Sequence, residues 1–264
     1  MEGVQATQQS SSSSMATYPP WVMLEPFADV ETTGSYSTAN PNTLVVARTS
    51  AGHPIGVSLR IASPPAQSRV CIHFPRGSDP VNYENQVIAA HGDSVLIRVA
   101  LEQDYDTLRD YFVYNAGDAA ADSPQPASLS LLPPCYRYLV KDSTGILRRS
   151  EDELVVARLE IVRPNDETPK EHVVEMLLLR NCKWWLLRWP RIIDDLGADE
   201  LRWWRSSTVI PVGDHMLCWV CKHQGLFFCN VFDENLVLRY VRLPDRGPQL
   251  QRKILLKPER LQLC

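Results

Sequence analysis

The stretch TVIPVGDHMLCWVCKHQGLFFCNVFDENLVLRYVRL, residues 208–243, decides the fold class. It holds short runs rich in β-branched and aromatic residues, separated by polar turns, and no run has the length of an ordinary helix. Successive antiparallel strands of this kind make one propeller blade or one sheet of a β-sandwich. The expected strands are residues 208–212, 216–222, 226–232 and 237–243.

The preceding sequence shows the same pattern of short apolar runs separated by polar turns. In residues 153–162, Leu159 and Ile161 alternate with Arg158 and Glu160, which is the period of a half-buried strand. This segment and residues 172–180, joined by a polar loop, are expected to form a long hairpin. Further strands are expected at 43–47, 55–61, 70–74 and 110–114, with a hairpin joining 86–90 to 94–101 and an edge segment beginning at Trp21.

These patterns predict an all-β protein. We expect an antiparallel meander that forms a partial or irregular β-propeller-like body, with a β-sandwich as the alternative. One or two short helices are also expected. The best candidate is residues 194–204, where Leu201 and Trp204 are spaced three apart behind a cluster of acidic residues.

The domain organisation follows from composition. Residues 1–17 are rich in Ser and Gln and are expected to be a disordered tail, with Met15 as an alternative start. Residues 18–244 are expected to form the β domain, and residues 115–128, rich in Ala, Asp and Pro, a surface loop within it. Residues 245–264 are then a C-terminal extension.

Charge and cysteine content narrow the function classes. The chain has 264 residues and a formal net charge of −4, so no basic field favours nucleic acid or an anionic membrane surface. No signal sequence opens it, and no apolar run approaches the ~20 residues that span a bilayer. Its seven cysteines are odd in number and scattered, which favours reduced thiols in the cytoplasm or nucleus.

The same C-terminal stretch resembles a plant family, the domain of unknown function numbered 1618, which is expanded in grasses. The resemblance rests on residues 208–211, 217–220, 225–232 and 240–244, and on their order and spacing. Further matches are residues 20–26, 110–114 followed by 132–134, and 177–180, so the resemblance covers most of residues 20–244.

The resemblance implies a β-rich, propeller-like body, sometimes associated with F-box proteins, and no established activity. Cys221 and Asn230 stand where the family tends to carry Asp, and the chain stops at Cys264 where further strands would be expected. We therefore interpret the chain as a member that is truncated at its C-terminus, and the closure of any propeller stays open.

One segment offers metal-ligating residue types: His215, Cys218, Cys221 and His223. A zinc knuckle needs a tight turn between its two cysteines, whereas Trp219 and its neighbour are strand formers. Side chains alternate along a strand, so the two thiols are expected on opposite faces, and the two imidazoles are roughly 26 Å apart. The expectation is buried, structural cysteines, with no metal and no cofactor.

The second candidate is a Trp-rich and Arg-rich block. Indole rings interleaved with cations suit a protein interface, although the acidic residues nearby argue against a nucleic acid groove. The alternative is that these Trp side chains fill the core while Arg stems cover their edges. The residues named for a candidate interaction patch are Trp184, Trp185, Arg188, Trp189, Arg202 and Trp203.

No catalytic residue is assigned. Asp104 with Asp106 and Asp194 with Asp195 read as solvated turn carboxylates, and the chain contains no nucleophile elbow, phosphate loop or dinucleotide fingerprint. The leading hypothesis is a non-catalytic protein-interaction module with an unknown protein partner. The alternative is an enzyme, hydrolase-like, whose catalytic residues are dispersed in the sequence.

The C-terminal strands are also expected to form the stability core of the domain, with Trp219 at its centre. Adjacent antiparallel strands should bury one face against their neighbours. The side chains expected in this core are Ile210, Leu217, Trp219, Phe227, Val231, Phe232, Leu238 and Val241.

Overall fold

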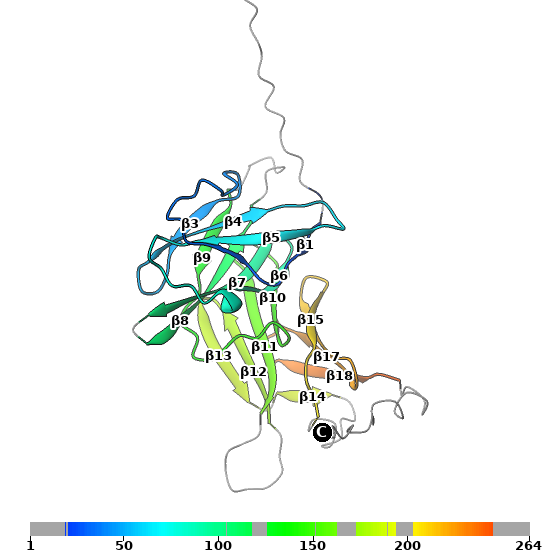
Figure 1. Ribbon diagram of the computed structural model, residues 1–264. Coiled ribbons are helices and arrows are strands. Elements are labelled where there is room, and N and C mark those ends of the chain that lie inside the picture. Colours follow the sequence, from blue (N-terminus) through cyan, green and yellow to red (C-terminus); the bar gives the residue numbers. More distant parts are fainter. Residues whose placement is uncertain are drawn as a thin grey trace, which may run out of the picture.

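The computed structural model describes residues 19, 21–103, 105–117, 126–150, 152–162, 173–188, 190–193 and 203–244. These residues form strands and connecting turns, which confirms the all-β prediction (Figure 1). The helical content of this described part is one turn of 3₁₀ helix, Asn82–Glu84. Of the predicted helix, residues 194–202 lie outside it, as do residues 1–17, 245–264 and 118–125 of the predicted loop; Trp203 and Trp204 are not helical.

The first sheet is mixed. Its strands β5, β4 and β3 are antiparallel neighbours, while β1 and β2 both pair with β5 in parallel. The predicted strands of this region are present within a few residues of their expected bounds. The bounds are β1 Met23–Leu24, β2 Asp29–Glu31, β3 Val45–Arg48, β4 Pro54–Arg60 and β5 Gln67–His73.

The second and third sheets are antiparallel meanders with their strands in chain order. The second holds β6 Gln86–His91, β7 Ser94–Gln103, β8 Asp106–Asn115 and β9 Ser128–Leu131. The third holds β10 Thr144–Arg148, β11 Leu154–Val162, β12 Val173–Arg180 and β13 Lys183–Arg188. Gly92, with a φ of 58°, makes the tight turn of the predicted β6–β7 hairpin.

The fourth sheet contains the strands predicted in residues 208–243. Its order is β14-β18-β17-β16-β15, with β14 parallel to β18 and the other pairs antiparallel. The bounds are β14 Arg191–Ile193, β15 Thr208–Val212, β16 Met216–Cys221, β17 Gly225–Asn230 and β18 Val237–Arg242.

The four sheets stack face to face in chain order, because alternate side chains of the middle sheets are apolar on both faces. Along β11, Val155 and Leu159 pack toward the fourth sheet and Val156 toward the second. Along β7, Ile97 packs toward the first sheet and Leu96 toward the third. Three apolar layers result, one at each junction between consecutive sheets.

The second, third and fourth sheets each bring one edge strand to the same side of the stack. Strand β10 lies beside β6 of the second sheet and beside β15 of the fourth (Figure 1). Gly145 of β10 allows this approach, since a Cβ there would lie 2.8 Å from Val209 Cγ1 and 2.9 Å from Leu217 Cδ1. None of the four sheets is closed, so the described body is an open stack of β-sheets, in keeping with a sandwich-like or irregular all-β fold.

The predicted core is correct at its centre and wrong at two positions. Trp219 is fully buried between the third and fourth sheets, and its Nε1 donates to the Ser143 carbonyl at 2.9 Å. Ile210 and Val241 are instead 47% and 43% exposed. They belong to the opposite set of alternating residues, and a run that is apolar at every position does not reveal which set faces inward.

Candidate functional site

The outer face of the first sheet, at one end of the stack, is polar. Asp29 of β2 accepts hydrogen bonds from Arg60 and Arg69, each at 2.8 Å. Ser58 and His73 lie on the same face, opposite to the apolar residues that contact the second sheet. Arg60 and Arg69 of this face reach solvent, whereas Ser58 and His73 are buried, with the Tyr36 ring against His73.

The outer face of the fourth sheet, at the other end, has the opposite character. The inward set includes Leu217, Trp219 and Phe227, so the alternate residues point away from the stack. We call this surface the terminal face. It consists of Arg191, Ile193, Thr208, Ile210, Val212, Met216, Cys218, Val220, Leu226, Phe228, Asn230, Val237, Arg239 and Val241.

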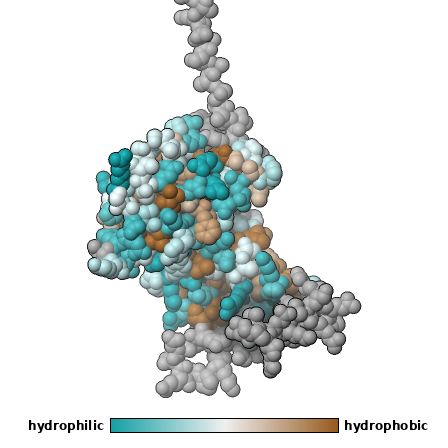
Figure 2. All heavy atoms as spheres, in the orientation of Figure 1, coloured by the Kyte–Doolittle hydropathy of each residue, from teal (hydrophilic) through white to brown (hydrophobic). Residues whose placement is uncertain are grey.

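The register places two apolar rows across the terminal face. Ile210, Cys218 and Phe228 are paired in succession across β15, β16 and β17. In the next row, Val220, Leu226 and Val241 are paired across β16, β17 and β18. The brown, apolar atoms in Figure 2 include a group in the region that β15 occupies in Figure 1. Of these six residues Ile210 and Val241 are exposed, Val220, Leu226 and Phe228 are partly buried, and Cys218 is buried between its neighbours. An apolar surface of this kind marks an interaction site on a folded protein.

The charged side chains on the strands of the terminal face are both arginines. Arg239 follows Phe228 in the first row, and Arg191 lies on the neighbouring strand β14. The strand residues of this face include no Asp or Glu. Within the described residues, neither Arg191 nor Arg239 forms an ion pair. A guanidinium group pairs well with the carboxylate of a partner.

The residues predicted as a Trp/Arg patch are divided between the two faces of β13. Trp184 is half-buried and its Nε1 donates to the Pro133 carbonyl at 3.0 Å. Arg188, on the same face, donates to Glu175 Oε1 at 2.9 Å. Trp185 lies on the opposite face and is 61% exposed. The alternation of the strand therefore separates Trp185 from the other two.

The remaining patch residues follow β13 in the chain, at positions 189, 202 and 203. Trp203 is 66% exposed, while its neighbour Trp204 is buried against Phe227, with ring centroids 4.5 Å apart. Trp189 and Arg202 lie outside the described residues. The block thus supplies both a core residue and exposed indoles.

The cysteines of β16 are placed as the alternation predicts. Cys221 packs in the layer between the third and fourth sheets, whereas Cys218 lies on the terminal face. Burial raises the pKa of the Cys218 thiol to about 11, so it is protonated at neutral pH and a weak nucleophile. In the described part of the chain, no three His, Cys, Asp or Glu side chains are grouped to hold a metal ion.

One constellation was not anticipated from the sequence. Ser58 Oγ lies 3.0 Å from His73 Nε2, and His73 Nδ1 lies 3.3 Å from Glu31 Oε2. The roles match a nucleophile, a general base and an orienting carboxylate. The three residues come from β4, β5 and β2 and are brought together only by the register of these strands. No local sequence motif therefore predicts the set.

This Ser–His–Glu array is closed off from solvent. Ser58 and His73 are buried, and the Tyr36 ring lies edge-on over His73 with centroids 5.9 Å apart. Glu31 accepts a hydrogen bond from Thr38, while His73 Nδ1, despite its distance to Glu31, has no aligned hydrogen-bond partner. Burial holds the pKa of His73 below its usual value, against the opposing effect of Glu31. The imidazole is therefore neutral at pH 7.

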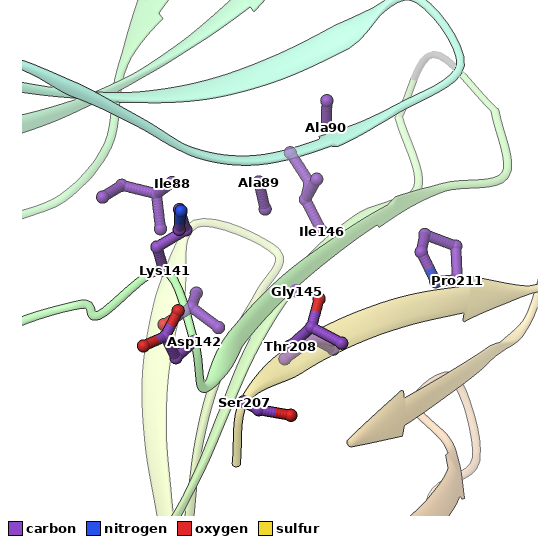
Figure 3. Close-up of a pocket in the computed structure, with 12 residues that line it drawn as sticks. Ile88, Ala89, Ala90, Lys141, Asp142, Gly145, Ile146, Ser207, Thr208 and Pro211 are labelled. Atoms are coloured by element: carbon purple, nitrogen blue, oxygen red, sulfur yellow. The ribbon is translucent and has the colours of Figure 1, made fainter. Parts of the chain in front are cut away.

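A cavity of about 270 Å³ lies where β6, β10 and β15 come together (Figure 3). Small and apolar residues of the three strands line it, together with Lys141, Asp142 and Ser207. Its volume is just below the range of ligand pockets, roughly 300–1,000 Å³. Lys141 and Asp142 are the titratable residues of its lining, which gives no nucleophile with an adjacent base.

Comparison of the chain with known protein families, with curated proteins and with solved structures found no match in any of the three. Among the described residues, no helix combines the length and the apolar composition that crossing a bilayer requires.

Proposed function

We propose that this protein is a non-catalytic protein-interaction module that binds a protein partner through the terminal face. The observation that carries the proposal is the contrast between the two ends of the stack. The first sheet ends in Asp29, Arg60 and Arg69, whereas the fourth ends in rows of Ile, Val, Leu and Phe. Each internal face with that composition is covered by another sheet, so the terminal face has the character of an interface.

We also propose in which cell compartment the protein acts and to which family it belongs. The described cysteines are all free thiols, in keeping with a reducing compartment such as the cytoplasm or nucleus. Membership of the grass-expanded plant family, with its occasional F-box association, is proposed on the sequence resemblance alone.

The test is affinity capture with paired variants. Ile210→Asp with Val241→Asp places two carboxylates on the terminal face at exposed positions, where folding is little affected. Val46→Asp is the matched control, a 53% exposed apolar residue on β3 of the first sheet. We expect proteins captured by the wild type to be lost with the double variant and retained with the control. Capture that is equal in all three proteins would refute the terminal face as the binding site.

A second candidate function is the hydrolysis of small carboxylic esters, favoured by the Ser–His–Glu array. In that reaction Ser58 Oγ attacks the ester carbonyl and gives its proton to His73 Nε2, which passes it to the departing alkoxide; water then releases the acyl group by the reverse path. Access requires the segment carrying Tyr36 to move, since its ring covers His73.

This second candidate is tested with an alkyl fluorophosphonate, which labels activated serines. Hydrolysis predicts slow labelling of Ser58 in the wild type, faster labelling in Tyr36→Ala and none in Ser58→Ala. If Tyr36→Ala is folded by circular dichroism and still unlabelled, the array is a structural hydrogen-bond network.

A further inference from the structure

We infer that the partner bound at the terminal face presents a β-sheet, packed face to face on the fourth sheet, with carboxylates opposite Arg191 and Arg239. This inference rests on the proposed function and specifies the chemistry of the partner. It draws on three features of the molecule: the way its own sheets pack, the position of β15, and the charge of the terminal face.

The junctions inside the molecule show what covers a face of this composition. Each is a sheet-on-sheet contact in which apolar side chains of both sheets pack in one buried layer. The terminal face repeats that pattern, with the small Cys218 between the larger Ile210 and Phe228 in one row. Alternation of small and large side chains along a row accepts the ridges of an opposing sheet.

The position of β15 indicates where a partner sheet would lie. β10 is the strand of the third sheet that lies beside β6, and β15 is the strand of the fourth that lies beside β10. β15 is an edge strand of its own sheet. A partner sheet that repeats this arrangement would place one edge strand beside β15, over Ile210, as β15 itself lies beside β10.

Charge decides between a second copy of this chain and a different partner. A symmetric pair would bring two sets of Arg191 and Arg239 onto one desolvated interface whose strand residues include no carboxylate. Removing guanidinium groups from water without partners is costly. Asp or Glu side chains on a different protein would instead form charge-assisted hydrogen bonds with both arginines.

The experiment measures binding of purified proteins. The probe is the protein whose capture the Ile210→Asp/Val241→Asp variant abolishes, titrated by calorimetry at low and at high salt. We compare the wild type with Arg191→Glu/Arg239→Glu, with Arg191→Ala/Arg239→Ala, and with Lys183→Glu as a control for charge at an exposed residue of β13.

We expect the charge reversal to weaken binding at least about tenfold at low salt, and alanine to weaken it less, because reversal adds repulsion that salt screens. Lys183→Glu should bind as the wild type. Equal affinity of the reversed and wild-type proteins would overturn the carboxylate partner while leaving the interaction module intact. A homodimer by light scattering that Ile210→Asp dissociates, or the absence of any protein captured through this face, would overturn the inference as well.

Discussion

Trp219 is the residue on which the junction of the third and fourth sheets depends most. It fills the centre of the apolar layer, contacts side chains of both sheets and anchors its indole to the Ser143 carbonyl. Trp219→Ala removes the transfer free energy of the ring and leaves a cavity, so we expect a loss of about 3–5 kcal/mol in the free energy of unfolding. Urea denaturation followed by circular dichroism measures it.

Ile210→Ala is the control for this prediction. Ile210 is apolar and belongs to the same sheet, but it lies on the terminal face, so its truncation in the free protein should cost well under 1 kcal/mol. Similar denaturation midpoints for Trp219→Ala and wild type would show that the inward and outward sets of the fourth sheet have been assigned in reverse.

His73 makes the stability of the first sheet sensitive to pH. Burial lowers its pKa below the usual value of 6.5, so the unfolded chain binds the proton more readily than the folded one. The resulting stability is complete above about pH 6.5 and is lost as the pH falls through the lower, folded-state pKa. We expect His73→Gln to flatten this part of the dependence, measured as unfolding free energies between pH 7.5 and pH 5 relative to wild type. Parallel curves for the two proteins would contradict it.

At the scale of single elements, alanine substitution is expected to cost different amounts of stability at Gly145 and at Gly56. A Cβ at Gly145 meets Val209 and Leu217 in the closest approach of the third and fourth sheets. A Cβ at Gly56 meets the Tyr36 ring at 2.6 Å, but Tyr36 is 38% exposed, so its ring has solvent rather than a packed layer on its outer side. We expect Gly145→Ala to cost about 1–3 kcal/mol by overpacking, and Gly56→Ala clearly less. Thermal denaturation compares them, and a larger loss for Gly56→Ala would contradict the packing described for β10.

Individual strands could be predicted wherever period-2 alternation or a clear turn was present. β11 and β12 follow from the alternation of Arg158 and Glu160 with apolar residues, and β6 and β7 from the turn at Gly92. β13 was not predicted as a strand, because KWWLLR is apolar or basic at every position. β10 was not predicted because it is short and Gly145 interrupts its apolar run, although that glycine allows the close approach of the third and fourth sheets.

The whole molecule could not be assembled from the sequence in the same way. Strands that are apolar on both sides predict burial, but they do not say which sheet covers which face. The terminal face escaped notice for this reason, since Phe227 and Phe228 look equivalent in the sequence and point to opposite sides of β17. The Ser–His–Glu array escaped because its members are joined only through β2, β4 and β5.

The serial stacking of the sheets predicts an uneven distribution of local stability. β7, β11 and β12 are buried on both faces, whereas β1, β2 and β14 are short strands of the end sheets. Amide hydrogen exchange should therefore be slowest in the first three strands and fastest in the last three, because exchange follows local opening. Uniform protection across all four sheets would contradict this stacking.

The central claim is that the terminal face is where this protein meets its partner, and site-specific photo-crosslinking tests it most directly. A benzophenone amino acid is incorporated singly at Ile210, Val241, Val46 or Trp185, each in the full chain, and crosslinked products are identified by mass spectrometry. We predict a common crosslinked protein from Ile210 and Val241 and none from Val46. Crosslinking from Trp185 alone, with Ile210 and Val241 silent, would contradict the claim and place the binding surface on the edge strand β13.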